Sequence, residues 1–289
     1  MNANTSRFRQ AILIIVLAAL AVLTVLPFWT GITLSQKSKA EIIGSFWSLP
    51  KAFHPEYYVD AFRSIYRYIL NSLLVAIISV AGAVFLASLS GYVFARIDFG
   101  GKELLFILVL SLMMIPGILT LIPSFLWFKE FPFIGGNNWL GQGGSGFLNS
   151  RWVLIIPYIS GGQVFGLFLC RTFFQSINES LFEAARIDGA SEFRVYLNIA
   201  LPLSLPIIAT LAIMNFVGIY NDYIWPLVTI SDASIQTFSV GVTQLGADDP
   251  VNLAPIMSGY IIGSIPLIIA FAFGMKYYIE GLSKGGVKG

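Results

Sequence analysis

Charged residues are scarce in this sequence. Only 11% of its 289 residues are Asp, Glu, Lys or Arg, whereas 56% are hydrophobic. Soluble globular domains carry charge on about a quarter of their residues, so this composition excludes that class and indicates a membrane protein. The formal net charge is only +2, which gives no basis for expecting nucleic acid as a partner.

Cysteine and histidine are almost absent. The chain has one of each, Cys170 and His54. A zinc site or a Cys/His catalytic pair needs several such residues together, so we expect no catalytic residues and no metal ligands. Cys170 is expected to be a small packing residue and His54 a surface residue. A single cysteine also excludes an intrachain disulfide bond.

A nucleotide-binding loop is missing as well. A P-loop reads G-x-x-x-x-G-K-[ST], because its backbone N–H groups and its lysine hold the phosphates. The nearest stretch, "DFGGKELL" around Lys102, lacks the first glycine and the hydroxyl residue. We therefore expect no cofactor bound by this chain, and any ATP and Mg²⁺ would be bound by a separate ATPase.

Long uncharged runs dominate what is present. A helix needs roughly 20 apolar residues to cross the hydrocarbon core of a bilayer. Such runs predict an all-α, polytopic bundle of six spans, which lie between Arg9 and Lys37, Arg67 and Arg96, Glu103 and Lys129, Arg151 and Arg171, about Leu201 and Ile230, and Asp249 and Lys276.

The first run could also be a cleaved signal peptide, since Arg7 and Arg9 precede it. Its apolar core, from Ala11 to Phe28, exceeds the usual length of about 7–15 residues, and no A-x-A site follows, so we interpret it as a retained anchor. Ten of the 17 Lys and Arg residues then fall on the side of the N-terminus. This bias predicts that both termini are cytoplasmic, although the first outer loop opposes it.

Small residues and prolines are the informative positions within the runs. The pairs Gly162/Gly166 and Gly259/Gly263 have G-x-x-x-G spacing, and Ala83, Ala87 and Gly91 share one helix face. Such faces let helix backbones approach closely, and we expect packing within the subunit. Kinks around a cavity are expected at Pro116, Pro123, Pro157, Pro226 and Pro266.

One concentrated polar patch interrupts the apolar sequence between Asn178 and Pro206. Ser180 and Glu183 have the spacing of a capping box, which predicts a helix start. Gly189 can end this helix in the left-handed conformation, and Ser191 can cap a second one. The first helix would present a face of small residues, formed by Leu181, Ala184, Ala185 and Gly189.

Several motifs of this chain resemble a known family. The spacing E-A-A, three residues, G, nine residues, I-x-L-P is met by Glu183, Ala184, Ala185, Gly189, Ile199, Leu201 and Pro202. This resembles the cytoplasmic loop of permease subunits in binding-protein-dependent ABC importers. "IYNDYIWPLV" is similar to the W-N-[DE]-[FY]-x-W-P-L segment of sugar permeases, with Tyr220 where tryptophan is common. The ending "GLSKGGVKG" resembles the terminus of the smaller, maltose-type permease.

The resemblance implies a type I ABC importer permease in a bacterial or archaeal cytoplasmic membrane. Its partners would be a second, non-identical permease, two ATPase subunits and an extracytoplasmic substrate-binding protein. The coupling loop would dock in a cleft of the ATPase, and the tail would reach between the ATPase subunits. The residues implied are Glu183, Ala184, Ala185, Asp188, Gly189, Ile199, Leu201 and Pro202 in the loop, and Ser283, Lys284, Gly285 and Gly286 in the tail.

The expected organisation has four parts. Residues 1–35 form the cytoplasmic N-terminus and first helix, 36–67 an extracytoplasmic loop, 68–280 a five-helix core that includes the coupling loop at 176–202, and 281–289 a glycine-rich tail too flexible for an ordinary helix end. The first loop, with its aromatic residues, is expected to contact the binding protein. Another outer loop, 135–146, is expected to be flexible because it is rich in glycine.

The transport path and its cargo are less defined. Asn221, Asp222 and Trp225 are candidates to line the path, but Asn221 and Asp222 could equally cap a helix near the outer surface. An ion-coupled secondary transporter would need acids within the spans, and only Asp222 qualifies. A membrane-embedded enzyme lacks clustered catalytic groups. The cargo could be a neutral oligosaccharide, monosaccharide, polyol, glycerol phosphate or uronate chain.

Overall fold

The computed structural model describes residues 3–286, with side chains described for residues 9–275. This part of the chain contains helices and loops but no strand, as the sequence predicts. Its principal helices are α1 (Ala3–Leu34), α2 (Lys39–Gly44), α3 (Pro55–Arg96), α4 (Lys102–Ser111), α5 (Gly117–Lys129), α6 (Trp152–Ser176), α7 (Glu179–Ile187), α8 (Glu192–Val195), α9 (Leu201–Leu203), α10 (Leu205–Asn221), α11 (Ile224–Thr229), α12 (Phe238–Gly241) and α13 (Ala254–Gly286).

Four of these helices are long and apolar enough to cross a membrane. They contain Arg9–Leu34, Pro55–Arg96, Trp152–Ser176 and Ala254–Met275. Two further candidates are bent pairs, Lys102–Met114 with Gly117–Lys129 and Glu192–Leu203 with Leu205–Asn221. If each bent pair is one span, the described residues provide six spans, which agrees with the number of uncharged runs.

The bends occur where the backbone loses its helical hydrogen bonds. The third run turns by 98° at Ile115 and Pro116, where Ile115 has the extended conformation expected before proline. The fifth run turns by 77° near Ser204, between Pro202 and Pro206. The kink predicted at Pro116 is confirmed, but the third and fifth runs are not straight helices.

The loop after α1 is shorter than predicted. Helix α3 begins at Pro55, so residues 55–67, assigned to this loop from the sequence, are helical. Proline suits the first turn of a helix because it needs no donor there and its φ is already helical. Charged residues interrupt residues 55–67, so no uncharged run marks this stretch in the sequence. The helix nevertheless extends through it, well beyond the apolar segment.

The chain falls into two compact units, and α3 and α13 contribute to both. The first unit comprises Met1–Tyr66 and Val242–Ile265. Within it, the buried Lys37 donates hydrogen bonds to the carbonyl oxygens of Ser45 at 2.8 Å and Phe46 at 2.7 Å. Lys39 pairs with Asp249 at 2.8 Å, and this bond holds the pKa of Asp249 below its ordinary value. These contacts fix the turn after α1.

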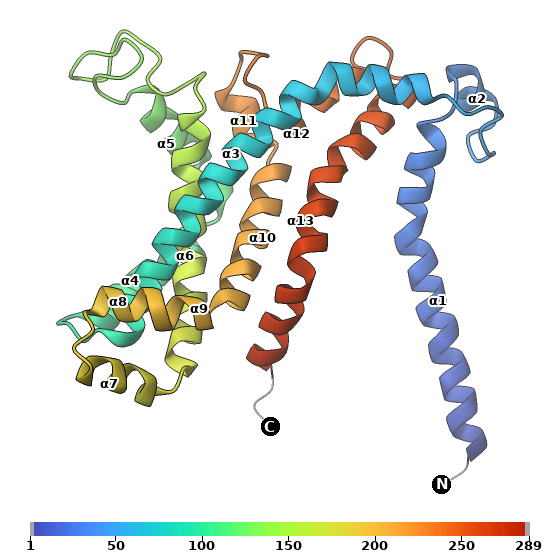
Figure 1. Ribbon diagram of the computed structural model, residues 1–289. Coiled ribbons are helices and arrows are strands. Elements are labelled where there is room, and N and C mark those ends of the chain that lie inside the picture. Colours follow the sequence, from blue (N-terminus) through green and yellow to red (C-terminus); the bar gives the residue numbers. More distant parts are fainter. Residues whose placement is uncertain (1–2, 287–289) are drawn as a thin grey trace. The chain divides into compact units, whose positions relative to one another are not determined.

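The second unit comprises Arg67–Gly241 and Pro266–Gly289. Its helices α3, α6 and α10 pack along one another, with α7 and α8 at one end and α11 and α12 at the other (Figure 1). Two apolar clusters form its core. One gathers around Trp225, Val153 and Leu154, and the other around Tyr92, Phe174 and Phe182. The second cluster lies directly behind the polar patch noted in the sequence.

Small residues bring the helices of this unit together, as predicted. A Cβ atom added at Gly166 would meet Ala87 Cβ at 2.6 Å and Leu211 Cδ2 at 2.7 Å. A Cβ atom at Gly91 would meet Cys170 Cβ at 2.5 Å and the backbone nitrogen of Arg171 at 3.0 Å. Helix α3 therefore approaches the backbone of α6 at Gly91, and side chains of α10 lie directly against α6 at Gly166.

Gly91→Leu is expected to destabilise the protein. Because the obstruction includes backbone atoms of α6, it cannot be relieved by a rotamer change, and overpacking typically costs about 1–3 kcal/mol. Gly161→Leu, on the open side of α6, is the matched control, since an added Cβ there meets nothing within 4 Å. The midpoint of thermal unfolding in detergent should fall for the first variant only. Equal midpoints would show that the α3–α6 contact is not tight.

The glycine-rich loop at residues 135–146, predicted to be flexible, is built from hydrogen-bonded turns. Asn137 Nδ2 donates to the carbonyl oxygens of Lys129 at 2.8 Å and Phe131 at 3.0 Å. Asn138 Oδ1 accepts from the backbone N–H groups of Leu140 and Gln142. The glycines of this loop allow close backbone contacts and positive φ angles. The two asparagines form hydrogen bonds that a glycine-rich composition does not predict.

The C-terminal segment also differs from the prediction. The backbone of α13 stays helical to Gly286, so residues 281–286 do not form a separate non-helical tail. A glycine costs about 1 kcal/mol in a helix, which does not stop a helix already nucleated by a long apolar segment. Residues 287–289, the remainder of the predicted tail, lie outside the described residues.

Candidate functional site

The polar patch begins with helix α7, which is capped by Asn178. The side-chain oxygen of Asn178 accepts a hydrogen bond from the N–H of Ser180 at 3.2 Å. The capping box predicted at Ser180 and Glu183 is therefore wrong, because the helix starts at Glu179, before Ser180. Asparagine is as good an N-cap as serine, and Asn178, which lies closer to the end of α6 than Ser180 does, is the residue that caps the helix.

Gly189 ends α7 as the sequence predicts. Its φ is +78°, and its N–H donates to the carbonyl oxygen of Arg186 at 3.0 Å. The N–H of Ala190 reaches the carbonyl oxygen of Ala185, also at 3.0 Å. These two bonds form a Schellman motif, which reverses the chain sharply. Ser191 occupies the N-cap position of α8, but its side chain makes no capping hydrogen bond.

A network of ion pairs holds the α7–α8 turn against α3. Arg96, whose side chain is 7% exposed, pairs with Glu179 and donates to the carbonyl oxygens of Phe174 and Ile177. Its guanidinium carbon also lies 4.1 Å from the centre of the Phe182 ring. Planar guanidinium groups combine such bonds with stacking on aromatic rings, which lysine does not do.

A second arginine continues the network within the turn. Arg186 Nε donates to Glu192 Oε1 at 2.8 Å, and Arg186 Nη1 lies 3.2 Å from Glu179 Oε1. The hydrogen bond with Glu192 raises the pKa of Arg186 above its ordinary value. Glu192 also accepts from the hydroxyl of Tyr92, on α3, at 2.8 Å. The turn is therefore joined to α3 at Glu179, the start of α7, and at Glu192, the start of α8.

The two faces of α7 differ in exposure. Phe182 is completely buried among the aromatic residues of the core, and Ala185 is half-buried beside it. The opposite face is exposed and includes Leu181, Ala184 and Ile187, the last with 85% of its surface accessible. The small-residue face predicted from the sequence is thus divided, because Ala185 turns inward and Ala184 outward.

The remaining residues of the motif lie on different surfaces. Glu183, Asp188 and Gly189 are exposed, and Glu183 makes no ion pair with any residue in the described part of the chain. Ile199 and Leu201 pack partly against the core, and Pro202 is exposed at the bend that follows. The tail residues Ser283, Lys284, Gly285 and Gly286 lie at the end of α13, and their side chains are outside the described set.

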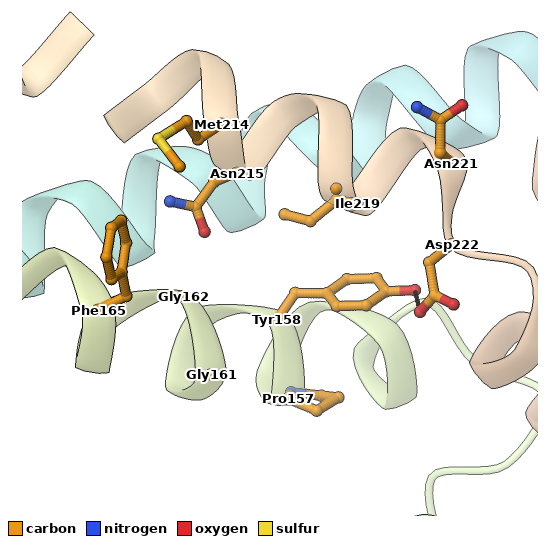
Figure 2. Close-up of a pocket in the computed structure, with 11 residues that line it drawn as sticks. Pro157, Tyr158, Gly161, Gly162, Phe165, Met214, Asn215, Ile219, Asn221 and Asp222 are labelled. Carbon is orange, nitrogen blue, oxygen red and sulfur yellow. Dashed lines mark hydrogen bonds between the residues drawn. The ribbon is translucent and has the colours of Figure 1, made fainter. Parts of the chain in front are cut away.

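A cavity of about 530 Å³ lies between α6 and α10, toward the end of the unit opposite α7 (Figure 2). Its walls are mostly apolar, with open stretches at Gly161 and Gly218, where an added Cβ atom would meet nothing within 4 Å. The hydroxyl of Tyr158 crosses from α6 to donate to Asp222 Oδ2 at 2.7 Å. This bond joins the two walls at one end of the cavity.

The three predicted path residues do not lie together. Asn221 and Asp222 line the cavity at the end of α10. Asp222 caps no helix with its side chain, since α11 starts at Ile224 without a side-chain cap. Trp225 is buried in the core, where its indole N–H donates to the carbonyl oxygen of Val153 at 2.8 Å. Trp225 therefore holds α11 on α6 and does not line this cavity.

Three residues of these sites were missed in the sequence. In the sequence Arg96 only ends an uncharged run, which gives no sign that it anchors α7. Tyr158 and Asn215 line the cavity, and Asn215 is an amide in the middle of an otherwise apolar run. Polar groups within a span are expensive and are functional candidates, and that signal could have found Asn215. No comparable signal exists for Tyr158, whose partner is 64 residues away.

Comparison with known families decides the identity of the chain. Residues 83–284, which contain both the α7–α8 turn and the cavity, match the family described as the binding-protein-dependent transport system inner membrane component. The chain belongs to this family. As such a component it is a multi-pass permease of the inner membrane, and the match covers most of its described helices.

Relatives extend the likeness over almost the whole permease. It is 31% identical over 287 residues to the polygalacturonan/rhamnogalacturonan transport system permease protein YtcP of Bacillus subtilis, covering 93% of this chain and 94% of that one. It is 30% identical over 254 residues to the probable ABC transporter permease protein YurM of the same organism, covering 88% and 80%.

A solved structure supports the fold of the permease. A chain from the crystal structure of a bacterial ABC transporter for import of the acidic polysaccharide alginate matches with a TM-score of 0.81. The match covers 96% of this chain and 99% of that chain, at 19% sequence identity. The type I importer permease fold expected from the sequence is therefore confirmed.

Proposed function

We propose that this permease is one of two membrane subunits of an ATP-driven importer that carries a saccharide or related polyol. A second, non-identical permease would complete the path, two ATPase subunits would bind ATP and Mg²⁺, and an extracytoplasmic binding protein would deliver the cargo. Family membership supports dependence on a binding protein, and the cargo named for the YtcP relative supports the saccharide class.

The observation that carries the proposal is the construction of α7. Its buried face is anchored to α3 through Arg96 and Phe182, whereas its opposite face is exposed, apolar and bordered by the unpaired acid Glu183. An exposed apolar patch with a polar rim is typical of a protein–protein contact. We infer that this face docks in the ATPase and that both termini, like α7, are cytoplasmic.

Alternating access follows from this arrangement. Closure of the ATPase dimer around ATP would move α7, and the ion pairs to α3 would transmit the movement to the helices that line the cavity. Nucleotide and cargo shift the balance between inward-open and outward-open states only through different affinities for the two states. The permease would thus perform no chemical step itself.

Uptake into membrane vesicles tests the proposed function. Vesicles with the assembled transporter should accumulate saccharide when ATP is inside and the binding protein outside, with every ion gradient collapsed. Uptake that requires a proton or sodium gradient and ignores ATP would instead support the secondary transporter. The measurement separates the two classes without knowledge of the natural cargo, provided that a panel of saccharides is offered.

The C-terminal segment gives a further prediction. Deletion of residues 283–289 should leave the complex assembled but lower its substrate-stimulated ATP hydrolysis, because the segment would contact the ATPase subunits. Chain ends are often dispensable, so an effect would be informative. The measurement compares hydrolysis with and without loaded binding protein in the purified complex. An unchanged stimulation ratio would assign no role to the segment.

A further inference from the structure

The polar side chains of the α6–α10 cavity are two amides, a tyrosine and a carboxylate. Asn215 Nδ2 donates to the carbonyl oxygen of Leu211 at 2.9 Å, and Asn221 Nδ2 donates to that of Val217 at 3.0 Å. A carbonyl oxygen can only accept, so each amide must turn its nitrogen toward the helix backbone. Each amide keeps its oxygen as an acceptor and one further N–H as a donor.

Asp222 adds a negative charge to this set. Its Oδ2 accepts from Tyr158, whereas its Oδ1 accepts no hydrogen bond within the described chain. None of the eleven residues drawn in Figure 2 is a lysine, an arginine or a histidine. The hydroxyl of Tyr158 is directed at the carboxylate and is not available to donate elsewhere.

The remaining surface of the cavity is flat and apolar. The Tyr158 ring extends along the groove, and Phe165 and Met214 stand at its other end (Figure 2). Aromatic and apolar walls with a few convergent polar groups are typical of small-molecule sites. A sugar ring fits this combination, because it has apolar C–H faces and hydroxyl groups at its edges that donate hydrogen bonds.

We propose that this cavity is a saccharide subsite selective for uncharged, hydroxyl-rich sugars and unsuited to uronates. The inference rests on the proposed function and specifies its substrate class. A sugar hydroxyl donates to Asp222 Oδ1 or to an amide oxygen. A uronate carboxylate can only accept, so it cannot take the place of a sugar hydroxyl on Asp222, and the like charge of Asp222 repels it. Two of the compared transporters carry acidic polysaccharides, and this chain would differ from them in cargo.

Cysteine protection tests the subsite directly. Cys170 is the only cysteine of the chain, so a Cys170→Ala background can receive Gly218→Cys, whose added side chain has open space in the cavity. The assembled, nucleotide-free transporter is treated with a neutral maleimide, and labelling of this chain is followed by mass spectrometry. The probes are neutral tetrasaccharides of glucose, xylose and arabinose, and the tetrasaccharides of galacturonate and mannuronate, at one shared concentration. Gly117→Cys, outside the cavity, is the positional control.

At least one neutral tetrasaccharide should slow labelling at position 218 about tenfold more than either uronate, the scale of one hydrogen bond to a charged group. Labelling at position 117 should not respond. Adding Asp222→Asn should improve protection by the uronates and so reduce the difference in protection between neutral and uronate tetrasaccharides. Asp232→Asn, in an exposed loop, is the control and should leave that difference unchanged. Equal or better protection by the uronates, no protection by any saccharide, or a difference that survives Asp222→Asn would each overturn the inference.

The vesicle uptake assay distinguishes failure of the subsite from failure of the function. One outcome is that a saccharide is taken up with ATP and yet gives no protection at position 218. That result would support the importer function and show that the cavity does not bind the transported saccharide. Absence of ATP-driven uptake for every saccharide in the panel would instead contradict the proposed function itself.

Discussion

Gly189→Val should reduce ATP-driven uptake about tenfold or more while the protein still inserts and assembles. The φ of Gly189 is +78°, where a β-branched residue is strained by about 1–3 kcal/mol. An added Cβ atom meets nothing within 4 Å in this chain, so the damage comes from backbone strain and from whatever docks on α7. The measurement is uptake per assembled complex.

Two further variants separate these causes. Gly101→Val has the same strain, since Gly101 has a φ of +79° and equally open surroundings, but it lies at the start of α4. It should retain most of the transport activity. Gly189→Asn introduces a side chain that tolerates positive φ, so it tests bulk rather than strain. Wild-type uptake in both Gly189 variants would remove the docking role from this turn.

Arg96→Met should abolish most transport because it detaches α7 from α3. The change takes from Glu179 one of its two arginine partners and removes a donor from the carbonyl oxygens of Phe174 and Ile177. Because Glu179 is half-exposed, we expect the cost to lie below the figure of about 3–5 kcal/mol for a fully buried pair. Hydrogen exchange in residues 178–191 should become faster, whereas exchange in the α3–α6 interface should not. Uptake and exchange are measured on the same preparation.

Lys102→Gln is the matched control for the lost positive charge. Lys102 pairs with Asp98, a fully exposed residue in the loop between α3 and α4, and pairs that are open to solvent contribute about 0–1 kcal/mol. The control should transport normally. Normal uptake by Arg96→Met with unchanged exchange would mean that Phe182 packing and the Tyr92–Glu192 bond hold α7 without Arg96.

The sequence was most informative where a single residue type decides local geometry. Gly189 predicted the end of α7, and Pro116 predicted the bend of the third run. The glycines of α3 and α6 predicted close helix packing. Each of these predictions depends on a property of the residue itself, the tolerance of positive φ, the missing N–H or the missing side chain.

Features that depend on distant partners escaped prediction. The cavity requires Tyr158 to reach Asp222, and the anchoring of α7 requires Arg96 to reach Glu179 across 83 residues. Neither pairing has a local signature. The extension of α3 back to Pro55 was missed for another reason, because charged residues end an apolar run without ending a helix.

Competing local signals explain the remaining errors. Asn178 and Ser180 both suit an N-cap, and only the path of the chain from α6 selects the first. Trp225 lies in a motif shared with sugar permeases, yet its indole is buried against Val153 and serves packing. The motif therefore does not reveal which of its side chains face the cavity.

Cross-linking from α7 tests the central claim most directly. In the Cys170→Ala background, Ala184→Cys places a thiol on the exposed face of α7, and Asp232→Cys places one in an exposed loop at the other end of the unit. A thiol-to-amine cross-linker is added to transport-competent complexes, and the products are identified by mass spectrometry. We predict a product between position 184 and an ATPase subunit, with none from position 232. Complexes that transport but yield no ATPase product from position 184 would contradict the account.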